Sequence, residues 1–395
     1  MFEQLIIFLI KYKAIILFYL AIIIFLITKR KSLDFQAKII VLYRMKWGLK
    51  LIEKVSTKFR EAIILLGYIG VGAGYVGLVF ISVILIKNLY DLITTPTAVN
   101  GVSLVLPGIN VPGMGVLPFW YWILAIFTIA LVHEFSHGIV ARAHKIPVNN
   151  TGIVLLGPII GAFVEPDEEK LRKEKDIKQY SVLAAGSFSN ILLAIVALLL
   201  LNFCFAPLQD LMVEPTGFTF DNYDGTNLPF EQAGIVPGTL ITGIDGKETL
   251  QFQEFSTDLT CLNPGDKIII NTATQSYPLT LGTSPYDPEQ GYLGIKEIHN
   301  EVAVKEKYEQ GIWNVIYNFV DWINGFLRWL FILSLGIGLF NLLPLPIVDG
   351  GRMLQVYLHK SKGKEKGEKR YHQIGIFFLL VLLLNLFWPL LSKLF

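Results

Sequence analysis

The sequence predicts a polytopic α-helical membrane protein with about six transmembrane helices and an inserted soluble α+β domain. Hydrophobic residues make up 53% of the chain and charged residues only 17%, whereas soluble domains carry about a quarter charged residues. Between about 213 and 300 the charge rises and the apolar runs shorten to strand length. Six apolar runs are long enough to cross a bilayer, at about 12–28, 62–86, 117–142, 180–204, 326–347 and 372–393.

The distribution of basic residues predicts the orientation of these spans. Lys and Arg are dense in 29–60 and 359–370, whereas the loop 87–116 contains only Lys87. Since basic loops stay in the cytoplasm, we expect both termini and the 205–325 region outside. Large apolar residues interleave with the basic ones in 29–60, which favours an amphipathic helix on the inner leaflet over a solvated linker. The net charge of +2 gives no reason to expect a nucleic-acid partner.

These features divide the chain into four regions. Residues 1–116 hold two transmembrane helices and the basic segment, and 117–205 form the first part of a membrane core. Residues 206–310 form the soluble domain, where turn signals such as Asp245-Gly246 separate strand-like runs such as Thr239–Ile244. Residues 311–395 complete the membrane core with an amphipathic segment and two helices.

The third apolar span contains the motif His133-Glu134-Phe135-Ser136-His137. Two His four residues apart project from one face of a helix and can hold one Zn²⁺, and the Glu beside the first His can act as general base. Ionisable groups at membrane depth are costly, so they indicate function. The alternative is a buried His pair with a proton-relay Glu.

A catalytic zinc needs a third protein ligand, and Asp349 is the acid predicted at the depth of His133 and His137. It lies in a Pro- and Gly-rich break after Asn341, where a regular helix cannot continue. The alternative role for Asp349 is an N-cap of the following helix. A rival set of ligands is the acidic group after the motif span, Glu165, Asp167, Glu168 and Glu169.

Two further segments adjoin the motif helix in this interpretation. Gly186 and Asn190 share one face of the fourth span, where the small residue would let the helices approach and the amide could orient a ligand or a polarised carbonyl. Interhelical hydrogen bonding is the alternative role for Asn190. Residues 151–164 are apolar but too short to span, and Gly157-Pro158 divides them, which favours a hairpin dipping into the membrane over a capping loop.

Together, His133-Glu134-x-x-His137, Gly186-x-x-x-Asn190 and Asn341-x-x-Pro344-x-x-x-x-Asp349-Gly350 resemble the site-2 protease family of intramembrane zinc metalloproteases. Residues 232–247 and 291–295 resemble the PDZ domain of its prokaryotic members. The resemblance covers about 117–355.

The resemblance implies peptide hydrolysis inside the membrane of a prokaryotic cell, with one catalytic Zn²⁺ held by His133, His137 and Asp349. Glu134 would be the general base, and Asn341 and Asn190 would hydrogen-bond the substrate backbone or the tetrahedral intermediate. Substrates would be single-span proteins such as anti-sigma factors or membrane-tethered regulators, held extended along the hairpin.

We expect the PDZ-like domain to bind peptide ends and to lie outside the cell, because of the distribution of basic residues. Water would reach the active site from the cytoplasmic side. Two rivals belong to other functional classes: a proton-coupled transporter that uses His133, Glu134 and Asp349 as relays, and a membrane-anchored PDZ adaptor without catalysis. Bound zinc would argue against both.

Overall fold

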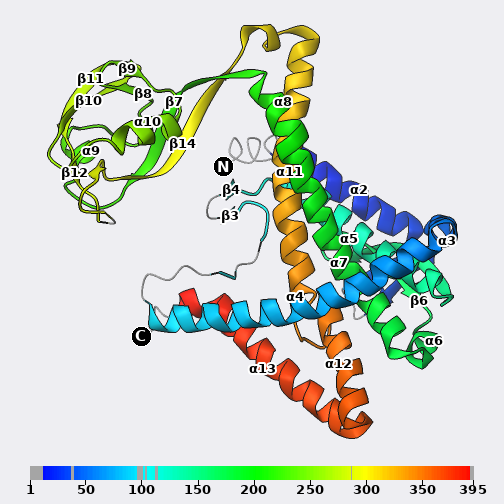
Figure 1. Ribbon diagram of the computed structural model, residues 1–395. Helices are drawn as coiled ribbons and strands as arrows, with labels where there is room; N and C mark the ends of the chain where they lie inside the picture. The colour runs from blue at the N-terminus through cyan, green and yellow to red at the C-terminus, as the bar shows by residue number, and fades with distance from the viewer. Residues whose placement is uncertain are drawn as a thin grey trace, which may run out of the picture. The chain divides into compact units, whose positions relative to one another are not determined.

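The computed structural model describes residues 12–36, 40–95, 101–102, 105–111, 114–285 and 287–391 (Figure 1). Two compact units divide the chain. One combines Met1–Leu201 with Gly325–Phe395, and the other is Asn202–Asn324. Helices dominate the first unit, and an antiparallel sheet dominates the second.

Five helices in the described part of the chain are long and apolar enough to cross a membrane. They are α4 (Arg60–Thr94), α5 (Phe119–Ala143), α7 (Asp176–Leu200), α11 (Gly311–Phe340) and α13 (Lys364–Leu391). A π-turn (Leu201–Phe205) and α8 (Ala206–Asp210) extend α7. The first predicted span corresponds to α2 (Lys13–Lys29), which has 17 residues and is not among the five, so the predicted count of six is not confirmed.

The chain between α11 and α13 bends back on itself. Helix α11 ends at Phe340, and α12 (Asp349–Lys362) begins after the proline-containing segment 341–348. The Gly350 N–H donates to the Asn341 carbonyl over 2.8 Å. A Cβ at Gly350 would lie 2.1 Å from the Leu342 carbonyl oxygen, and one at Gly351 would lie 1.8 Å from that of Leu345. Only glycine permits this close approach, so the first turn of α12 can pack against the preceding segment.

A four-stranded antiparallel sheet lies beside α5. Its order is β1 (Leu33–Gln36), β2 (Ile40–Met45), β5 (Val148–Leu156) and β6 (Ile159–Pro166). The paired strands of the predicted hairpin at 151–164 are present as β5 and β6, which turn at Gly157 with φ +56°. Entry of this hairpin into the membrane stays a prediction. The described residues also include the short strands β3 (Asn110–Val111) and β4 (Gly115–Val116), and α6 (Glu168–Lys173) after β6.

The prediction of one amphipathic helix over 29–60 is wrong in its first half. After a 3-10 turn at Arg30–Ser32, the chain forms β1 and β2, and only α3 (Trp47–Lys58) is helical. Strand β2 pairs along its whole length with β5, from Ile40 opposite Leu156 to Met45 opposite Thr151. This long-range pairing overrides the local helical pattern.

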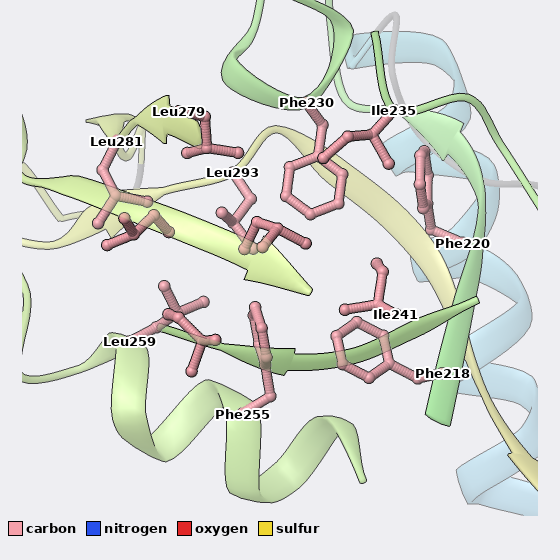
Figure 2. Close-up of a cluster of buried hydrophobic side chains, with 13 residues drawn as sticks. Phe218, Phe220, Phe230, Ile235, Ile241, Phe255, Leu259, Leu279, Leu281 and Leu293 are labelled. Atoms are coloured by element: carbon pink, nitrogen blue, oxygen red, sulfur yellow. The ribbon is translucent and has the colours of Figure 1, made fainter. Parts of the chain in front are cut away.

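The second unit contains the region predicted to be a soluble domain, whose sheet has the order β11-β10-β8-β7-β14 with antiparallel neighbours. A cluster of buried aromatic and aliphatic side chains forms the hydrophobic core of this unit. Phe255 and Leu259 of α10 point from the helix toward the strands (Figure 2). The α+β character predicted for this region is therefore present. Its elements are β7 (Val213–Tyr223), α9 (Pro229–Gln232), β8 (Ile241–Ile244), β9 (Lys247–Glu248), α10 (Phe252–Leu259), β10 (Lys267–Thr272), β11 (Ser276–Thr280), β12 (Gly282–Thr283), β13 (Gly291–Tyr292), β14 (Ile295–Val304) and a 3-10 turn at Glu306–Tyr308.

Candidate metal centre and active site

Helices α5 and α12 bring together three side chains that could hold a metal ion. His133 and His137 lie one turn apart on α5, and Asp349 is the first residue of α12. Their nearest atoms form a small triangle: His133 Nε2 to His137 Nε2 is 3.2 Å, and Asp349 Oδ2 lies 3.2 Å and 3.3 Å from these two nitrogens. Across the described residues this is the one His, Cys, Asp or Glu group of three or more that could hold a metal ion.

The dimensions of this triangle fit zinc. Ligand atoms about 2.0–2.1 Å from a tetrahedral Zn²⁺ are separated from one another by about 3.3 Å. All three separations agree with that value, and the donor set of two imidazoles and one carboxylate leaves a fourth position for water or substrate. Asp349 is only 8% exposed, and a buried carboxylate needs partners of this kind. Its N-cap alternative loses support, since Val348 holds the N-cap position of α12.

Helix α7 presses directly against the two imidazole rings. A Cβ at Gly186 would lie 2.4 Å from His137 Nε2 and 2.6 Å from His133 Nε2, so this position admits no side chain. One turn later the Asn190 amide lies 3.1 Å from His133 Nδ1. The Val182 carbonyl lies 2.7 Å from His137 Nδ1. The sequence-predicted Gly186 and Asn190 therefore both contact the His pair.

Glu134 faces the β6 strand. Its Oε2 accepts a hydrogen bond from the Val164 N–H over 3.3 Å. Glu134 and the three metal-binding side chains line one cavity of about 280 Å³, and Asn341 reaches its wall from the end of α11. Five of the six sequence-predicted site residues therefore line this cavity. The sixth, Asn190, is fully buried and contacts His133 instead.

The cavity is also lined by an ion pair between α6 and α12. Glu168 Oε1 lies 2.8 Å from an Arg352 guanidinium nitrogen, and both residues line the cavity. Ile347, in the segment before α12, is 95% exposed at the same cavity. The cavity is thus bounded by a charged pair as well as by apolar side chains.

Three of the four rival acidic residues have other partners. Glu165 binds Arg44 over 2.9 Å and accepts from the Asn150 amide, and the hydrogen bonds from Arg44 lower the pKa of the Glu165 carboxyl. Asp167 caps α6 by accepting from the Lys170 N–H. Among the loop acids, only Glu168 lines the cavity, and it is paired with Arg352 rather than with the imidazoles.

Sequence reasoning missed several groups that shape this site. Ser187 Oγ lies 3.4 Å from Asp349 Oδ2, and its place beside Gly186 was the available signal. The Val182 carbonyl and the Val164 N–H are backbone groups, which leave no mark on residue identity. Arg352 follows the Asp349-Gly350-Gly351 sequence directly, but its partner on α6 is distant in the chain.

Comparison with known proteins agrees with this geometry. An uncharacterized protein of Methanocaldococcus jannaschii is 28% identical over 60% of this chain and 56% of its own length. The zinc metalloprotease RasP of Oceanobacillus iheyensis is 26% identical over 59% of this chain and 64% of its own. The regulator of sigma-W protease RasP of Bacillus subtilis is 31% identical over 30% of this chain and 25% of its own.

The chain thus spans roughly half to two thirds of the length of the first of these relatives. A solved PDZ domain of an SdrC-like protein from Listeria monocytogenes is 24% identical, covering 20% of this chain and 85% of its own, with a TM-score of 0.19. That likeness is too small to support an argument, so the PDZ resemblance of the second unit stays a prediction. The family model of Peptidase family M50 matches residues 121–382, which include every residue of the candidate centre, and the chain belongs to this site-2 protease family.

Proposed function

We propose that this protein is a zinc-dependent endopeptidase that hydrolyses peptide bonds within transmembrane segments of other proteins. The observation that carries the proposal is the triangle of His133, His137 and Asp349 atoms beside Glu134. The two His and Glu134 lie on α5, which is apolar enough to cross a membrane. Relatives named zinc metalloproteases support the same chemistry.

In this proposal His133, His137 and Asp349 hold one Zn²⁺. When bound, zinc supplies Lewis-acid polarisation of the scissile carbonyl and makes a water more acidic. Glu134 accepts the proton of the attacking water as its oxygen adds to the carbonyl carbon, and donates that proton to the amine nitrogen as the C–N bond breaks. Asn341, on the cavity wall, is placed to hydrogen-bond the substrate backbone.

The proposed substrate is a single-span membrane protein held in extended form. A helical span hides its peptide carbonyls, so it must unwind before hydrolysis. Strand β6 is the outer strand of its sheet, and its Val164 N–H points at Glu134. A substrate strand added along this edge would therefore place its backbone beside the general base. The name of the B. subtilis relative, regulator of sigma-W protease, favours anti-sigma factors or tethered regulators as substrates.

We also propose a location and an orientation. The protein would lie in the cell membrane of a prokaryote, with the PDZ-like domain outside and the cavity opening toward the cytoplasm, because basic residues concentrate at 29–60 and 359–370. The PDZ-like domain would bind peptide ends and so select trimmed substrates. Labelling of a cysteine introduced at Lys364 in intact cells tests this orientation, and labelling without permeabilisation would contradict it.

Reconstituted protein and a single-span reporter test the activity. We expect cleavage inside the reporter span, loss of cleavage after chelation, and recovery on adding zinc. Glu134→Gln should retain zinc but lose cleavage, because an amide cannot accept the proton of the attacking water. Purified wild-type protein without zinc would favour the transporter or adaptor reading, and substantial turnover by Glu134→Gln would assign the base elsewhere.

A further inference from the structure

Asn190 is fully buried between the motif helix and α11. Its side-chain Nδ2 lies 3.1 Å from His133 Nδ1, while its Oδ1 is buried with no hydrogen-bond partner. Helix α11 holds the backbone at this point, since Ser334 Oγ donates to the Asn190 carbonyl over 2.8 Å. A Cβ at Gly338 would lie 3.1 Å from Asn190 Cβ. The amide is therefore confined beside one ring nitrogen of one imidazole.

The two imidazole rings have different hydrogen-bond partners at Nδ1, and the partner determines which ring nitrogen carries the hydrogen. His137 Nδ1 lies 2.7 Å from the Val182 carbonyl, and a carbonyl only accepts, so the hydrogen lies on Nδ1 and Nε2 keeps its lone pair. At His133 the Asn190 NH₂ group faces Nδ1. A donated hydrogen there places the ring hydrogen of neutral His133 on Nε2, 3.2 Å from Asp349 Oδ2. In that form His133 Nε2 cannot bind a metal.

We propose that Asn190 is a positioning residue that holds His133 in its metal-binding form. A half-turn of the amide exchanges its two atoms, so that Oδ1 accepts a hydrogen bond from His133 Nδ1–H and Nε2 is free to bind zinc. This inference rests on the proposed zinc site and adds to it the hydrogen bond that fixes the His133 ring hydrogen on Nδ1.

The surroundings of the amide favour such an exchange. In the present orientation Oδ1 makes no hydrogen bond, so the half-turn breaks no bond on the far side of the amide. Ser334 on α11 holds the Asn190 backbone, and Gly338 on the same helix packs close to Asn190 Cβ, so the amide lies beside His133 in either orientation. Metal binding and amide orientation are therefore linked through one hydrogen bond.

Substitutions that keep or remove the acceptor test the proposal. Asn190→Asp offers acceptors only, whereas Asn190→Leu offers neither donor nor acceptor. Asn385→Leu is the matched control, because Asn385 is also fully buried, donates to the Leu85 carbonyl and has an Oδ1 without a partner. The measurement is zinc affinity by chelator competition on the full-length protein, together with the absorption spectrum of bound Co²⁺.

We expect Asn190→Asp to hold zinc within about threefold of the wild type, with an unchanged tetrahedral Co²⁺ spectrum. Asn190→Leu should weaken zinc binding by about 10–100-fold, as is typical when a hydrogen-bond partner of a metal-binding His is lost, and Asn385→Leu should bind as the wild type does. Equal loss in Asn190→Asp and Asn190→Leu would show that the amide acts as a donor and would overturn the proposal.

Other outcomes are also decisive. Wild-type affinity in Asn190→Leu would likewise overturn the proposal. If Asn385→Leu also loses zinc, replacing a buried Asn by Leu is enough to explain the loss in Asn190→Leu. The zinc affinity of Asn190→Asp then decides the proposal: near-wild-type affinity supports it, and a large loss overturns it. Wild-type protein that binds no zinc would overturn the proposed function itself, which separates the two failures.

Discussion

Gly186→Ala offers a sharp test of how the metal centre is packed. The added methyl would lie 2.4 Å from His137 Nε2, 2.5 Å from His133 Cε1 and 2.6 Å from His133 Nε2. Ordinary contacts begin at 3.4 Å, so α7 and the rings must separate by about 1 Å, the difference between 3.4 and 2.4 Å. A catalytic constellation tolerates displacements of only about 0.5 Å.

The effect on folding should be smaller than the effect on metal binding. Replacing Gly by Ala inside a helix stabilises it by about 1 kcal/mol, while forcing one extra methyl into a packed site costs about 1–3 kcal/mol. The net change in the free energy of unfolding is therefore about 0–2 kcal/mol. Zinc affinity should fall by at least about 100-fold, because two ligand atoms are displaced directly.

Zinc content after dialysis, thermal unfolding and reporter cleavage measure the three effects together. Gly336→Ala in α11 and Gly72→Ala in α4 are the controls, since a Cβ at either position would meet nothing within 4 Å. Both should keep zinc and unfold at or slightly above the wild-type temperature. A Gly186→Ala protein with full zinc occupancy and normal cleavage would refute the packing argument, and zinc loss in the controls would assign the effect to the membrane helices in general.

Three further predictions concern other parts of the structure. Asp349→Ala should lower both zinc content and cleavage while Glu169→Ala lowers neither; the opposite pattern would move the ligand set to the loop. Arg44→Leu should lower the unfolding temperature at pH 7, by the equivalent of about 1 kcal/mol or less for a partly exposed pair. The pKa of Glu165 is lowered in the folded state, so this difference is present above about pH 4.3 and is lost as pH falls through the folded pKa; an unchanged difference at pH 3 would contradict the pairing. Deleting 213–304 should leave zinc and the cleavage of a pre-trimmed substrate intact while admitting longer substrates, and loss of zinc would place part of the metal centre there.

Much of the site was predictable because its signals are local or periodic. The spacing of His133 and His137 fixes two ring nitrogens on one helix face, and the structure places them 3.2 Å apart. The Pro and Gly residues after Asn341 predict an end to the helix, and α11 ends at Phe340. Gly157-Pro158 marks the turn of the hairpin in the same way.

The remaining features depend on partners far away in the chain. Residues 33–45 were expected to be helical, and they form β1 and β2 because β2 pairs with β5, which begins at Val148. No residue pattern within 29–60 indicates that this segment pairs with β5. Arg44 illustrates the same limit, since it joins Asp34 of β1 to Glu165 of β6, and its basic charge alone suggested only the membrane surface.

Glycine positions define this site as much as the ligands do. Gly186 lets α7 reach the two imidazoles, while Gly350 and Gly351 let the chain fold over the start of α12 so that Asp349 arrives at the same place. A chain with a side chain at position 186 could keep His133, Glu134, His137 and Asp349. The added atoms would push the two rings away, so the distances between the ligand atoms would be lost. The motif is therefore best understood as a packing arrangement that brings three ligands from two distant helices within about 3.3 Å of one another.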